Sequence, residues 1–263
     1  MQVYRGMDVG TAKPTLIERR GIPHHMIDLV DPSEEFSVAS FRRRGRETMV
    51  GIKRPMMIVG GSGLHFRALV DPMSFAPTDP ELRNELEVTD PDDLVAELVE
   101  ADPTAGRHVD LANHRRVVRA LEIHRLTGET PSSRAQSAEA EELRRYKPEV
   151  EFTAIGLDPG EVLDSRIDQR LGEMREGGLM EEVDRLRGQL GRTAASAVGY
   201  REILAHLEGE MSESEAFQAV AANTRRLARR QRTWFQRDPR IRWIPWLEDP
   251  VGRVDRALGA LEM

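Results

Sequence analysis

The apolar residues near the start of the chain first follow a helical period and then gather into a short run. Residues 36–53 have the helical pattern, which ends at Pro55, and residues 56–59 form a continuous apolar run typical of a buried strand. Two glycines follow this run, and residues 64–70 again have a helical pattern. We therefore expect a strand, a glycine turn and a helix in this order.

The middle of the chain has helical patterns and few strand signals. Two Asp-Pro pairs, at 79–80 and 90–91, each place an N-capping acid before a proline at the first helical position. A third helix is expected to run from residue 113 to a glycine stop at residue 128. The polar stretch 129–142 is expected to be a loop or an exposed helix.

Strand chemistry returns in the last part of the chain, at residues 151–157 and again at residues 241–247. Between these runs, residues 163–176 repeat apolar positions every three or four residues and predict a helix. Ser212 and Glu215 form a candidate capping box at the start of a second, longer helix.

The order of these segments predicts an α/β fold in which an open parallel sheet is interrupted by a helical insertion. We expect residues 1–76 and 148–263 to form the core and residues 77–147 to form the insertion. The length of 263 residues suits one large domain or two smaller ones. The chain is 39% hydrophobic and 32% charged, which is ordinary for a soluble globular protein and too apolar for a disordered one.

Composition excludes several classes of protein. No stretch approaches the roughly 20 apolar residues that a membrane-spanning helix needs, and the first residues lack the apolar core of a signal peptide. The absence of cysteine excludes disulfides, thiol catalysis and cysteine-ligated metal sites. We expect a cytosolic protein that does not bind a membrane.

Positive charge is concentrated near the C-terminus, although the whole chain carries a net charge of −7. Residues 223–243 contain eight arginines and one acid, a local net charge of +7. Such a stripe favours RNA phosphates, but a solvated helix face explains the composition equally well. Trp234 and Phe235 beside the arginines suit an RNA groove or an unstacked base, whereas the apolar stripe that Trp234 continues indicates a core residue.

Residues 59–63, with the sequence Val-Gly-Gly-Ser-Gly, are the first candidate site. Glycine lets a backbone approach a ligand closely, and the free amides at the following helix start attract anions. Ser62 adds a hydroxyl where a phosphate oxygen could lie. A tight turn with no ligand is the structural alternative.

Arg115, Arg116 and Arg119 form a second candidate site. Arg115 and Arg119 are four residues apart and share a helix face, which Arg116 flanks. Three cations on one face suit a phosphate backbone. Surface pairing with nearby acids is the alternative.

Arg166 and Arg170 form a third candidate site, again with a spacing of four residues. A guanidinium group matches two phosphate oxygens at once. Ion pairs with Asp168 or Glu173 are the alternative interpretation.

The seven histidines do not predict a metal site, because no carboxylates cluster around them at ligand spacing. His24 and His25 follow Pro23 in an expected loop. One of them could orient a substrate, although a structural histidine is the more common case.

Five segments, taken together, resemble one family. The chain resembles the tRNA dimethylallyltransferases at residues 1–15, 59–64, 116–122, 197–202 and 230–235. These matches occur in the expected order from residue 1 to about residue 237, and the ordered set is far more specific than a single glycine turn.

The resemblance implies a P-loop NTPase-like parallel sheet core with a helical insertion that grips the anticodon stem-loop of tRNA. It implies transfer of a dimethylallyl group from dimethylallyl diphosphate to N6 of the adenosine just 3′ of the anticodon, assisted by Mg²⁺. A monomer is expected. The sequence identifies no metal ligands.

The resemblance also implies roles for individual residues. Ser62, where relatives usually have threonine, would contact the reacting centre, Arg166 or Arg170 would bind diphosphate, and His24 matches an active-site histidine. His65 stands where a tyrosine is common. The expected tRNA-binding residues are Met1, Gln2, Arg83, Arg115, Arg116, Val117, Val118, Arg119, Ser196, Ala197, Val198, Gly199, Tyr200, Arg201, Arg229, Arg230, Gln231, Arg232, Thr233, Trp234, Phe235 and Gln236.

One expected feature is not found in the sequence. The resemblance implies a phosphate-binding loop ending in Gly-Lys-Ser/Thr before the segment that opens this chain, and an aspartate base two residues before the position of Met1. No G-x-x-x-x-G-K-[ST] pattern occurs. We therefore expect a longer natural protein, and an isolated chain that is inactive and marginally stable because sheet edges are exposed. An in-frame loop of this kind upstream in the gene would support this expectation, and a stop codon there would contradict it.

Two other functions are consistent with the sequence. One is a noncatalytic tRNA-binding protein, which would bind tRNA with a steep salt dependence and transfer nothing. The other is a P-loop kinase acting on a small nucleotide, since its core would be similar. The extended arginine surfaces and the lack of a recognisable lid count against the kinase.

Overall fold

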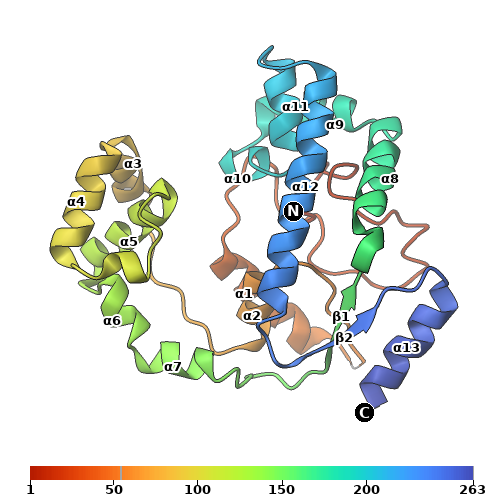
Figure 1. Ribbon diagram of the computed structural model, residues 1–263, viewed down its shortest axis with the longest axis horizontal. Helices are drawn as coiled ribbons and strands as arrows, with labels where there is room; N and C mark the ends of the chain where they lie inside the picture. The colour runs from red at the N-terminus through yellow and green to blue at the C-terminus, as the bar shows by residue number, and fades with distance from the viewer. Residues whose placement is uncertain (54, 263) are drawn as a thin grey trace. The chain divides into compact units, whose positions relative to one another are not determined.

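The computed structural model describes residues 1–53 and 55–262, which divide into two compact units (Figure 1). The core unit consists of Met1–Leu69 and Glu151–Met263, and the helical unit consists of Val70–Val150. The sequence pattern had placed the helical insertion at residues 77–147.

The helical unit contains the helices that the Asp-Pro pairs predict. The side chain of Asp79 accepts hydrogen bonds from the amides of Glu81 and Leu82, and that of Asp90 accepts one from Asp92. The predicted glycine stop is confirmed, because Gly128 has a φ of 75° and caps the third helix. The polar stretch forms two short helices. The α-helices of this unit are α3 (Pro80–Val88), α4 (Pro91–Ala101), α5 (His114–Thr127), α6 (Pro131–Ala135) and α7 (Ala138–Arg144), with a 3₁₀ turn at Ala105–Arg107.

The helical unit has a hydrophobic core of its own. Leu86, Leu94, Leu98 and Leu121 are fully buried where α3, α4 and α5 meet. Burial of a leucine side chain contributes roughly 1.5–3 kcal/mol. The apolar stripe of α5 therefore holds the three helices together.

The core unit consists of helices around a small sheet. Its longest helix, α12, has 23 residues and starts at the predicted capping box of Ser212 and Glu215. Helices α8 and α11 pack along it (Figure 1). The helices are α1 (Val38–Gly51), α2 (Gly63–Val70), α8 (Leu163–Glu176), α9 (Leu179–Leu186), α10 (Arg192–Ala195), α11 (Tyr200–Leu207), α12 (Glu213–Phe235) and α13 (Pro250–Glu262), with 3₁₀ turns at Gly160–Val162 and Arg187–Gln189.

The sheet has two parallel strands, β1 (Ala154–Asp158) and β2 (Ile241–Pro245). They pair in register from Ala154 opposite Ile241 to Asp158 opposite Pro245. Both strands were predicted, and the α/β class with a small parallel sheet is confirmed. A P-loop NTPase-like core stays a prediction.

The strand predicted at residues 56–59 is wrong. This segment is extended, but no other described segment pairs with it, and the side chains of Met57 and Val59 are 83% and 85% exposed. An apolar run becomes a strand only where a neighbouring strand satisfies its backbone groups. A prediction based on hydrophobic content alone therefore assigned a strand to this segment wrongly.

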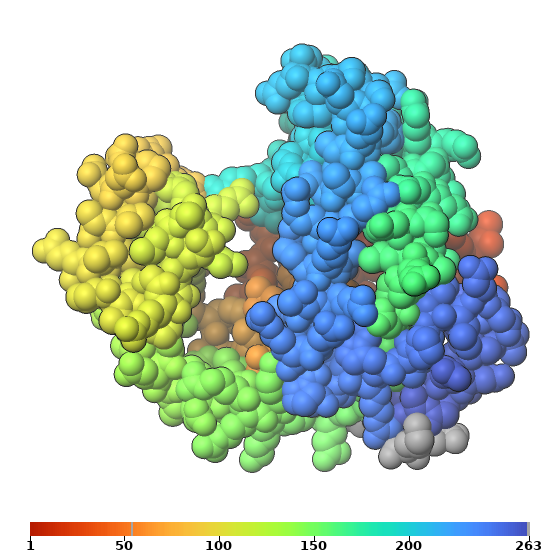
Figure 2. Space-filling model, viewed as in Figure 1, coloured from red at the N-terminus to blue at the C-terminus, as the bar shows by residue number. Residues whose placement is uncertain are grey.

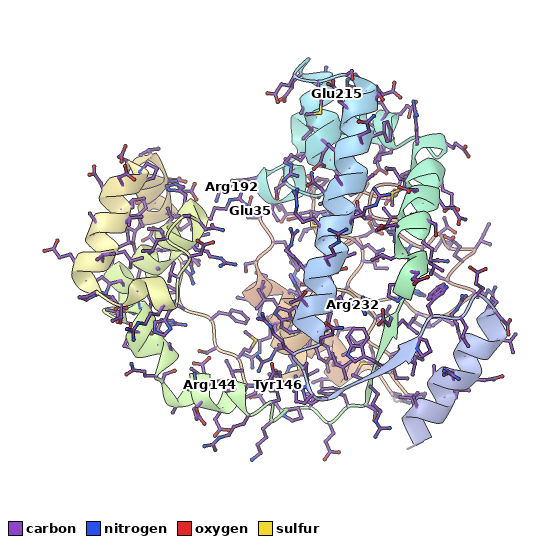
Figure 3. All side chains as sticks on the ribbon, viewed as in Figure 1. Glu35, Arg144, Tyr146, Arg192, Glu215 and Arg232 are labelled. Atoms are coloured by element: carbon purple, nitrogen blue, oxygen red, sulfur yellow. The ribbon has the colours of Figure 1, made fainter. Side chains whose placement is uncertain are left out.

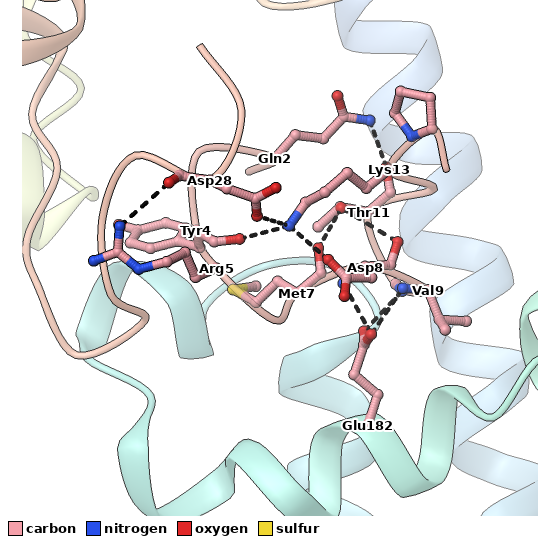
Figure 4. A network of polar contacts seen from close by, with 12 residues as sticks. Gln2, Tyr4, Arg5, Met7, Asp8, Val9, Thr11, Lys13, Asp28 and Glu182 are labelled. Atoms are coloured by element: carbon pink, nitrogen blue, oxygen red, sulfur yellow. Dashed lines mark hydrogen bonds and ion pairs between the residues drawn. The ribbon is translucent and has the colours of Figure 1, made fainter. Parts of the chain in front are cut away.

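The first 35 residues form turns that a buried carboxylate holds in place (Figure 4). Glu182 of α9 is 2% exposed and accepts hydrogen bonds from the amides of Asp8 (2.8 Å), Val9 (2.8 Å) and Gly10 (3.0 Å). The hydroxyl of Tyr200 donates a fourth hydrogen bond to Glu182, at 2.5 Å. Gly10 allows this approach, because an added β carbon would lie 2.6 Å from the Tyr200 ring.

Lys13, itself part of the opening segment, cross-links this segment through hydrogen bonds and ion pairs. Its ammonium group donates to the carboxylates of Asp8 (2.6 Å) and Asp28 (2.5 Å) and to the carbonyl of Tyr4 (2.8 Å), and its side chain is only 4% exposed (Figure 4). A buried cation needs such partners, since an unpaired one costs several kcal/mol. The opening segment is therefore ordered by electrostatic contacts instead of by regular secondary structure.

Among the described residues, no helix combines the length and the apolar character needed to cross a membrane.

Replacing Glu182 by alanine should destabilise the core unit strongly. The change leaves three amides and one hydroxyl without their acceptor, and we expect the free energy of unfolding to fall by about 3 kcal/mol or more. The measurement is a chemical denaturation curve. Glu181→Ala, at the exposed neighbouring position, should change stability by less than about 0.5 kcal/mol, and equal effects of the two changes would contradict the role of Glu182.

Candidate active site

The glycine turn, residues 60–63, packs against the C-terminal part of α12. A β carbon added to Gly63 would lie 1.9 Å from the Trp234 ring, and one added to Gly61 would lie 2.6 Å from the side chain of Gln231. At Gly63 only glycine permits this approach, whereas at Gly61 the flexible end of the Gln231 side chain is free to shift. The structure thus brings together two of the predicted segments, with Ser62 at their junction.

Trp234 is half-buried and takes part in packing. Its ring contacts Phe235 edge-on, with ring centroids 5.1 Å apart, and Phe235 in turn lies 6.3 Å from Phe66 of α2. The structural interpretation of Trp234 is therefore supported. Its ring belongs to the contact that fixes α12 beside the glycine turn.

The hydroxyl of Ser62 has a defined partner. Its Oγ lies 2.7 Å from Nδ1 of His65, one turn further along α2. The ring of His65 packs edge-on against Phe41 of α1, with centroids 4.7 Å apart and planes at 88°. Sequence reasoning missed this contact, although a spacing of three residues on a helix was a signal for it.

Arg166 lies near the carboxyl ends of the two parallel strands, where α/β proteins bind ligands. Its guanidinium stacks on Trp246 at 4.1 Å, and Arg253 covers the same ring at 4.0 Å. The backbone amide of Trp246 donates to the carbonyl of Asp158 (2.7 Å), the last residue of β1. Neither Trp246 nor Arg253 was predicted from the sequence.

The alternative ion pairs of Arg166 and Arg170 are not formed. Asp168 pairs with Arg225 at 2.5 Å, and Glu173 accepts a hydrogen bond from Gln169 at 2.8 Å. Arg170 is exposed and has no ion pair within the described residues. The donors of both arginines are therefore available to an anion.

The arginines of α12 have different partners. Arg225 pairs with Asp164 and Asp168, and Arg226 donates to Asn223. Arg232 pairs with Asp158 at 2.8 Å and so ties the end of α12 to the end of β1. Figure 3 labels Arg232 near this end of α12.

The remaining surface of α12 is open to solvent (Figure 2). Arg229 and Arg230 are exposed and form no ion pair within the described part of the chain. Thr233 and Gln236 are also exposed. Arg229 and Arg230 are therefore cations of this helix that are available to phosphates.

Ala197, Val198 and Tyr200 line one pocket of the core unit together with the opening segment, and its volume is about 200 Å³. The side-chain amide of Gln2, which also lines the pocket, donates to the carbonyls of Thr11 (3.1 Å) and Ala12 (3.0 Å). Gly199 has a φ of 97°, which favours glycine. The lining residues are Met1, Gln2, Gly10, Thr11, Ala197, Val198, Tyr200 and Leu227.

The expectation that residues 196–201 present an open binding surface needs correction. Tyr200 is fully buried and Ala197 is 9% exposed, so both form the pocket wall. Burial and the hydrogen bond to Glu182 raise the pKa of Tyr200, and its hydroxyl therefore stays protonated. Ser196 donates to the carbonyl of Thr193 (2.9 Å), and Arg201 donates to Glu202 (2.5 Å).

In the helical unit, two of the predicted arginines hold a buried carboxylate. Glu122 is fully buried and accepts from Arg83 (2.5 Å), Arg119 (2.6 Å) and the amide of Asp79 (3.0 Å). Arg119 also donates to two backbone carbonyls. The pairing alternative is therefore confirmed for Arg119.

Arg115 and Arg116 differ from Arg119, because they are exposed and unpaired among the described residues. The prediction that Val117 and Val118 contact tRNA is wrong, since they are 1% and 2% exposed. Both valines belong to the apolar stripe of α5 that packs in the core of the helical unit. Their side chains are therefore not available to tRNA.

His24 lies in an exposed loop, where its Nδ1 is 2.8 Å from the carbonyl of Ile22. Within the described residues, the hydrogen-bond partner of His24 is Ile22 and that of Ser62 is His65, so no hydrogen bond joins the two side chains. Its active-site role stays a prediction.

The described part of the chain contains no cluster of side chains that could coordinate the Mg²⁺ implied by the resemblance. No group of three or more histidine, aspartate or glutamate side chains gathers there at ligand distance. Mg²⁺ commonly keeps several waters and binds through substrate phosphates. We therefore assign no step of the chemistry to a metal held by these residues.

Buried acids in apolar stripes were the signal that the sequence interpretation overlooked. Glu122 lies beside Val118 and Leu121 on α5, and Glu182 lies beside Leu179 and Val183 on α9. A carboxylate in such a stripe must be paired or hydrogen-bonded when buried.

The fold and the site define an α/β protein with a small parallel sheet, a serine hydroxyl beside α12, and exposed arginines that have no acidic partner among the described residues. A comparison with family models then identifies the family. The chain belongs to the IPP transferase family, whose model matches residues 2–238.

Curated relatives match almost the whole chain. It is 42% identical over 270 residues to the tRNA dimethylallyltransferase of Bifidobacterium animalis subsp. lactis, covering 99% of this chain and 75% of the relative. It is 43% identical over 269 residues to the tRNA dimethylallyltransferase of Bifidobacterium longum, covering 99% and 79%.

Solved structures of the same kind share the fold. The full-length tRNA isopentenylpyrophosphate transferase of Bacillus halodurans is 34% identical, with a TM-score of 0.69 over 99% of this chain and 86% of that one. A eukaryotic dimethylallyltransferase acting on tRNA is 26% identical, with a TM-score of 0.73 over 97% of this chain and 69% of that one.

The buried ion pairs of Glu122 predict a pH dependence of stability. Burial by itself would raise the pKa of Glu122, but the hydrogen bonds from Arg83, Arg119 and Asp79 outweigh it and lower the pKa. The stabilisation is therefore complete above the unfolded-state pKa and is lost as the pH falls through the lower, folded-state pKa. We expect Glu122→Gln to reduce stability at neutral pH and to flatten its fall in acid.

Free energies of unfolding measured from neutral to acidic pH test this expectation. Glu100→Gln, at an exposed position of α4, should leave the pH dependence unchanged. An unaltered acid profile in Glu122→Gln would show that the carboxylate does not carry the effect.

Proposed function

We propose that this protein transfers a dimethylallyl group from dimethylallyl diphosphate to N6 of the adenosine immediately 3′ of the anticodon in tRNA. The observation that carries the proposal is the identity of 42–43% with tRNA dimethylallyltransferases over 99% of the chain. The junction of Ser62, α12 and the unpaired arginines supports it, because the reaction needs donors for a diphosphate beside a surface for RNA.

The reaction needs hydrogen-bond donors that stabilise the leaving diphosphate. N6 forms a bond to the allylic carbon, the carbon–oxygen bond to diphosphate breaks, and a general base accepts the N6 proton. The diphosphate leaves with additional negative charge, which hydrogen-bond donors stabilise. We assign this role to the Ser62 hydroxyl and to the guanidinium groups of Arg166 and Arg170, which would donate hydrogen bonds to the diphosphate.

We assign RNA binding to the exposed arginines. Arg229 and Arg230 of the core unit and Arg115 and Arg116 of the helical unit have no acidic partners among the described residues. Phosphate contacts of this kind position an RNA without reading its sequence. The target adenine must also leave its stack to reach the other substrate.

A transfer assay tests the proposal. Unmodified tRNA and labelled dimethylallyl diphosphate are incubated with the 263-residue chain and, in parallel, with the product of its complete reading frame. We expect at least one of the two proteins to label tRNA, and neither to label a tRNA in which the adenosine 3′ of the anticodon is replaced by guanosine. The absence of transfer by both proteins would contradict the proposed function.

Ser62→Ala should lower the rate of transfer by about 100-fold, the scale seen when one donor to a developing negative charge is removed. The affinity for tRNA should not change. Ser214→Ala, the same substitution at an exposed position of α12, is the matched control and should transfer normally. A wild-type rate in Ser62→Ala would exclude a contact between this hydroxyl and the reacting group.

Arg229 and Arg230 should set part of the salt dependence of tRNA binding. Because each neutralised phosphate contributes roughly 0.7 to 0.9 to the slope of log K against log salt, replacing both arginines by alanine should lower the slope by about 1.5. The corresponding lysine substitutions keep the charge and should keep the slope. A slope unchanged by the alanine substitutions would show that Arg229 and Arg230 do not contact the RNA phosphates.

A further inference from the structure

The contact between Ser62 and His65 has a consequence for catalysis. Ser62 immediately precedes α2, and His65 lies on the first turn of that helix. The two side chains meet at 2.7 Å, within the range of a good hydrogen bond. The serine that we assign to the leaving group is therefore already engaged by a neighbour.

The packing around His65 holds the imidazole in place and makes it neutral. The ring is half-buried, and its plane lies at 88° to that of the Phe41 ring in a T-shaped contact. Burial lowers the pKa of His65, so the ring is neutral at neutral pH. A neutral imidazole has one N–H and one lone pair, and the tautomer decides which of them faces Ser62.

The two tautomers have opposite effects on the serine. If Nδ1 accepts, the single hydroxyl proton of Ser62 points at His65. That proton is then unavailable for a hydrogen bond to the ligand. If Nδ1 carries the proton, it donates to Oγ and leaves the hydroxyl proton free for an anionic oxygen. An anion needs donors, so only the second arrangement serves the diphosphate.

We propose that His65 is a positioning residue for the reaction, and that its Nδ1–H donates to Oγ of Ser62 so that the hydroxyl is directed at the leaving diphosphate. This inference rests on the proposed function, in which Ser62 contacts that group. His65 itself touches no substrate. Its effect passes entirely through Ser62.

Two substitutions separate the hydrogen bond from the packing. His65→Phe keeps an aromatic ring against Phe41 and removes the hydrogen bond, and His65→Asn keeps a side-chain amide near the place of Nδ1. For His65→Phe we expect kcat to fall by about 10-fold with an unchanged KM for tRNA, and for His65→Asn we expect kcat within about 3-fold of the wild type. Equal losses in both variants would show that packing alone matters.

A double-mutant cycle tests whether His65 acts through Ser62. Once Ser62 is alanine, His65→Phe should have no further effect on kcat, because the group that it positions is gone. A full additional 10-fold loss in the Ser62→Ala background would overturn the proposal. Thermal melts of all four proteins separate this outcome from unfolding.

The tautomer is measured without any activity. Long-range ¹H–¹⁵N spectra of the protein, with His65 assigned by its loss in His65→Asn, should show Nδ1 protonated and its signal shifted in Ser62→Ala. An unprotonated Nδ1 would overturn the inference even if transfer to tRNA is observed. A protein that transfers nothing but shows the expected spectra would instead count against the proposed function.

Discussion

Helix α12 approaches the glycine turn so closely that no side chain fits between them. A β carbon at Gly63 would lie 1.9 Å from Trp234, a distance that packed atoms do not adopt. This contact fixes the arginine-bearing end of the helix beside the Ser62 hydroxyl. The pair of Arg232 with Asp158 then ties the same end to the carboxyl edge of the sheet. The glycine contact and the ion pair together therefore fix the arginines, the hydroxyl and the strand ends relative to one another.

Buried carboxylates organise both units in a similar way. Glu182 gathers three amides of the opening segment and the hydroxyl of Tyr200. Glu122 gathers two arginines and one amide in the helical unit. Losing one such acceptor leaves several donors unsatisfied, so each carboxylate matters more than a surface ion pair. Part of the arginine content of the helical unit thus serves the fold, and the exposed Arg115 and Arg116 remain for a ligand.

Local features of the chain could be predicted from the sequence, and long-range ones could not. The caps at Asp79, Asp90 and Ser212 depend on residues two or three positions away, and all three form as expected. The strand at residues 56–59 failed because strand formation depends on a partner elsewhere in the chain. The contact of Glu182 with Asp8 spans 174 residues and has no local pattern. Stacking of Arg166 on Trp246 is hidden from the sequence for the same reason.

The α/β core places the Ser62 hydroxyl beside α12, whose exposed arginines Arg229 and Arg230 have no acidic partner among the described residues, and the chain belongs to the IPP transferase family. We propose that an allylic diphosphate alkylates one adenine amino group at this junction. Mass spectrometry of nuclease fragments of the reacted tRNA tests the proposal. We expect the mass of a single dimethylallyl group, carried by the adenosine just 3′ of the anticodon. An unmodified tRNA, or a dimethylallyl group on any other nucleotide, would contradict it.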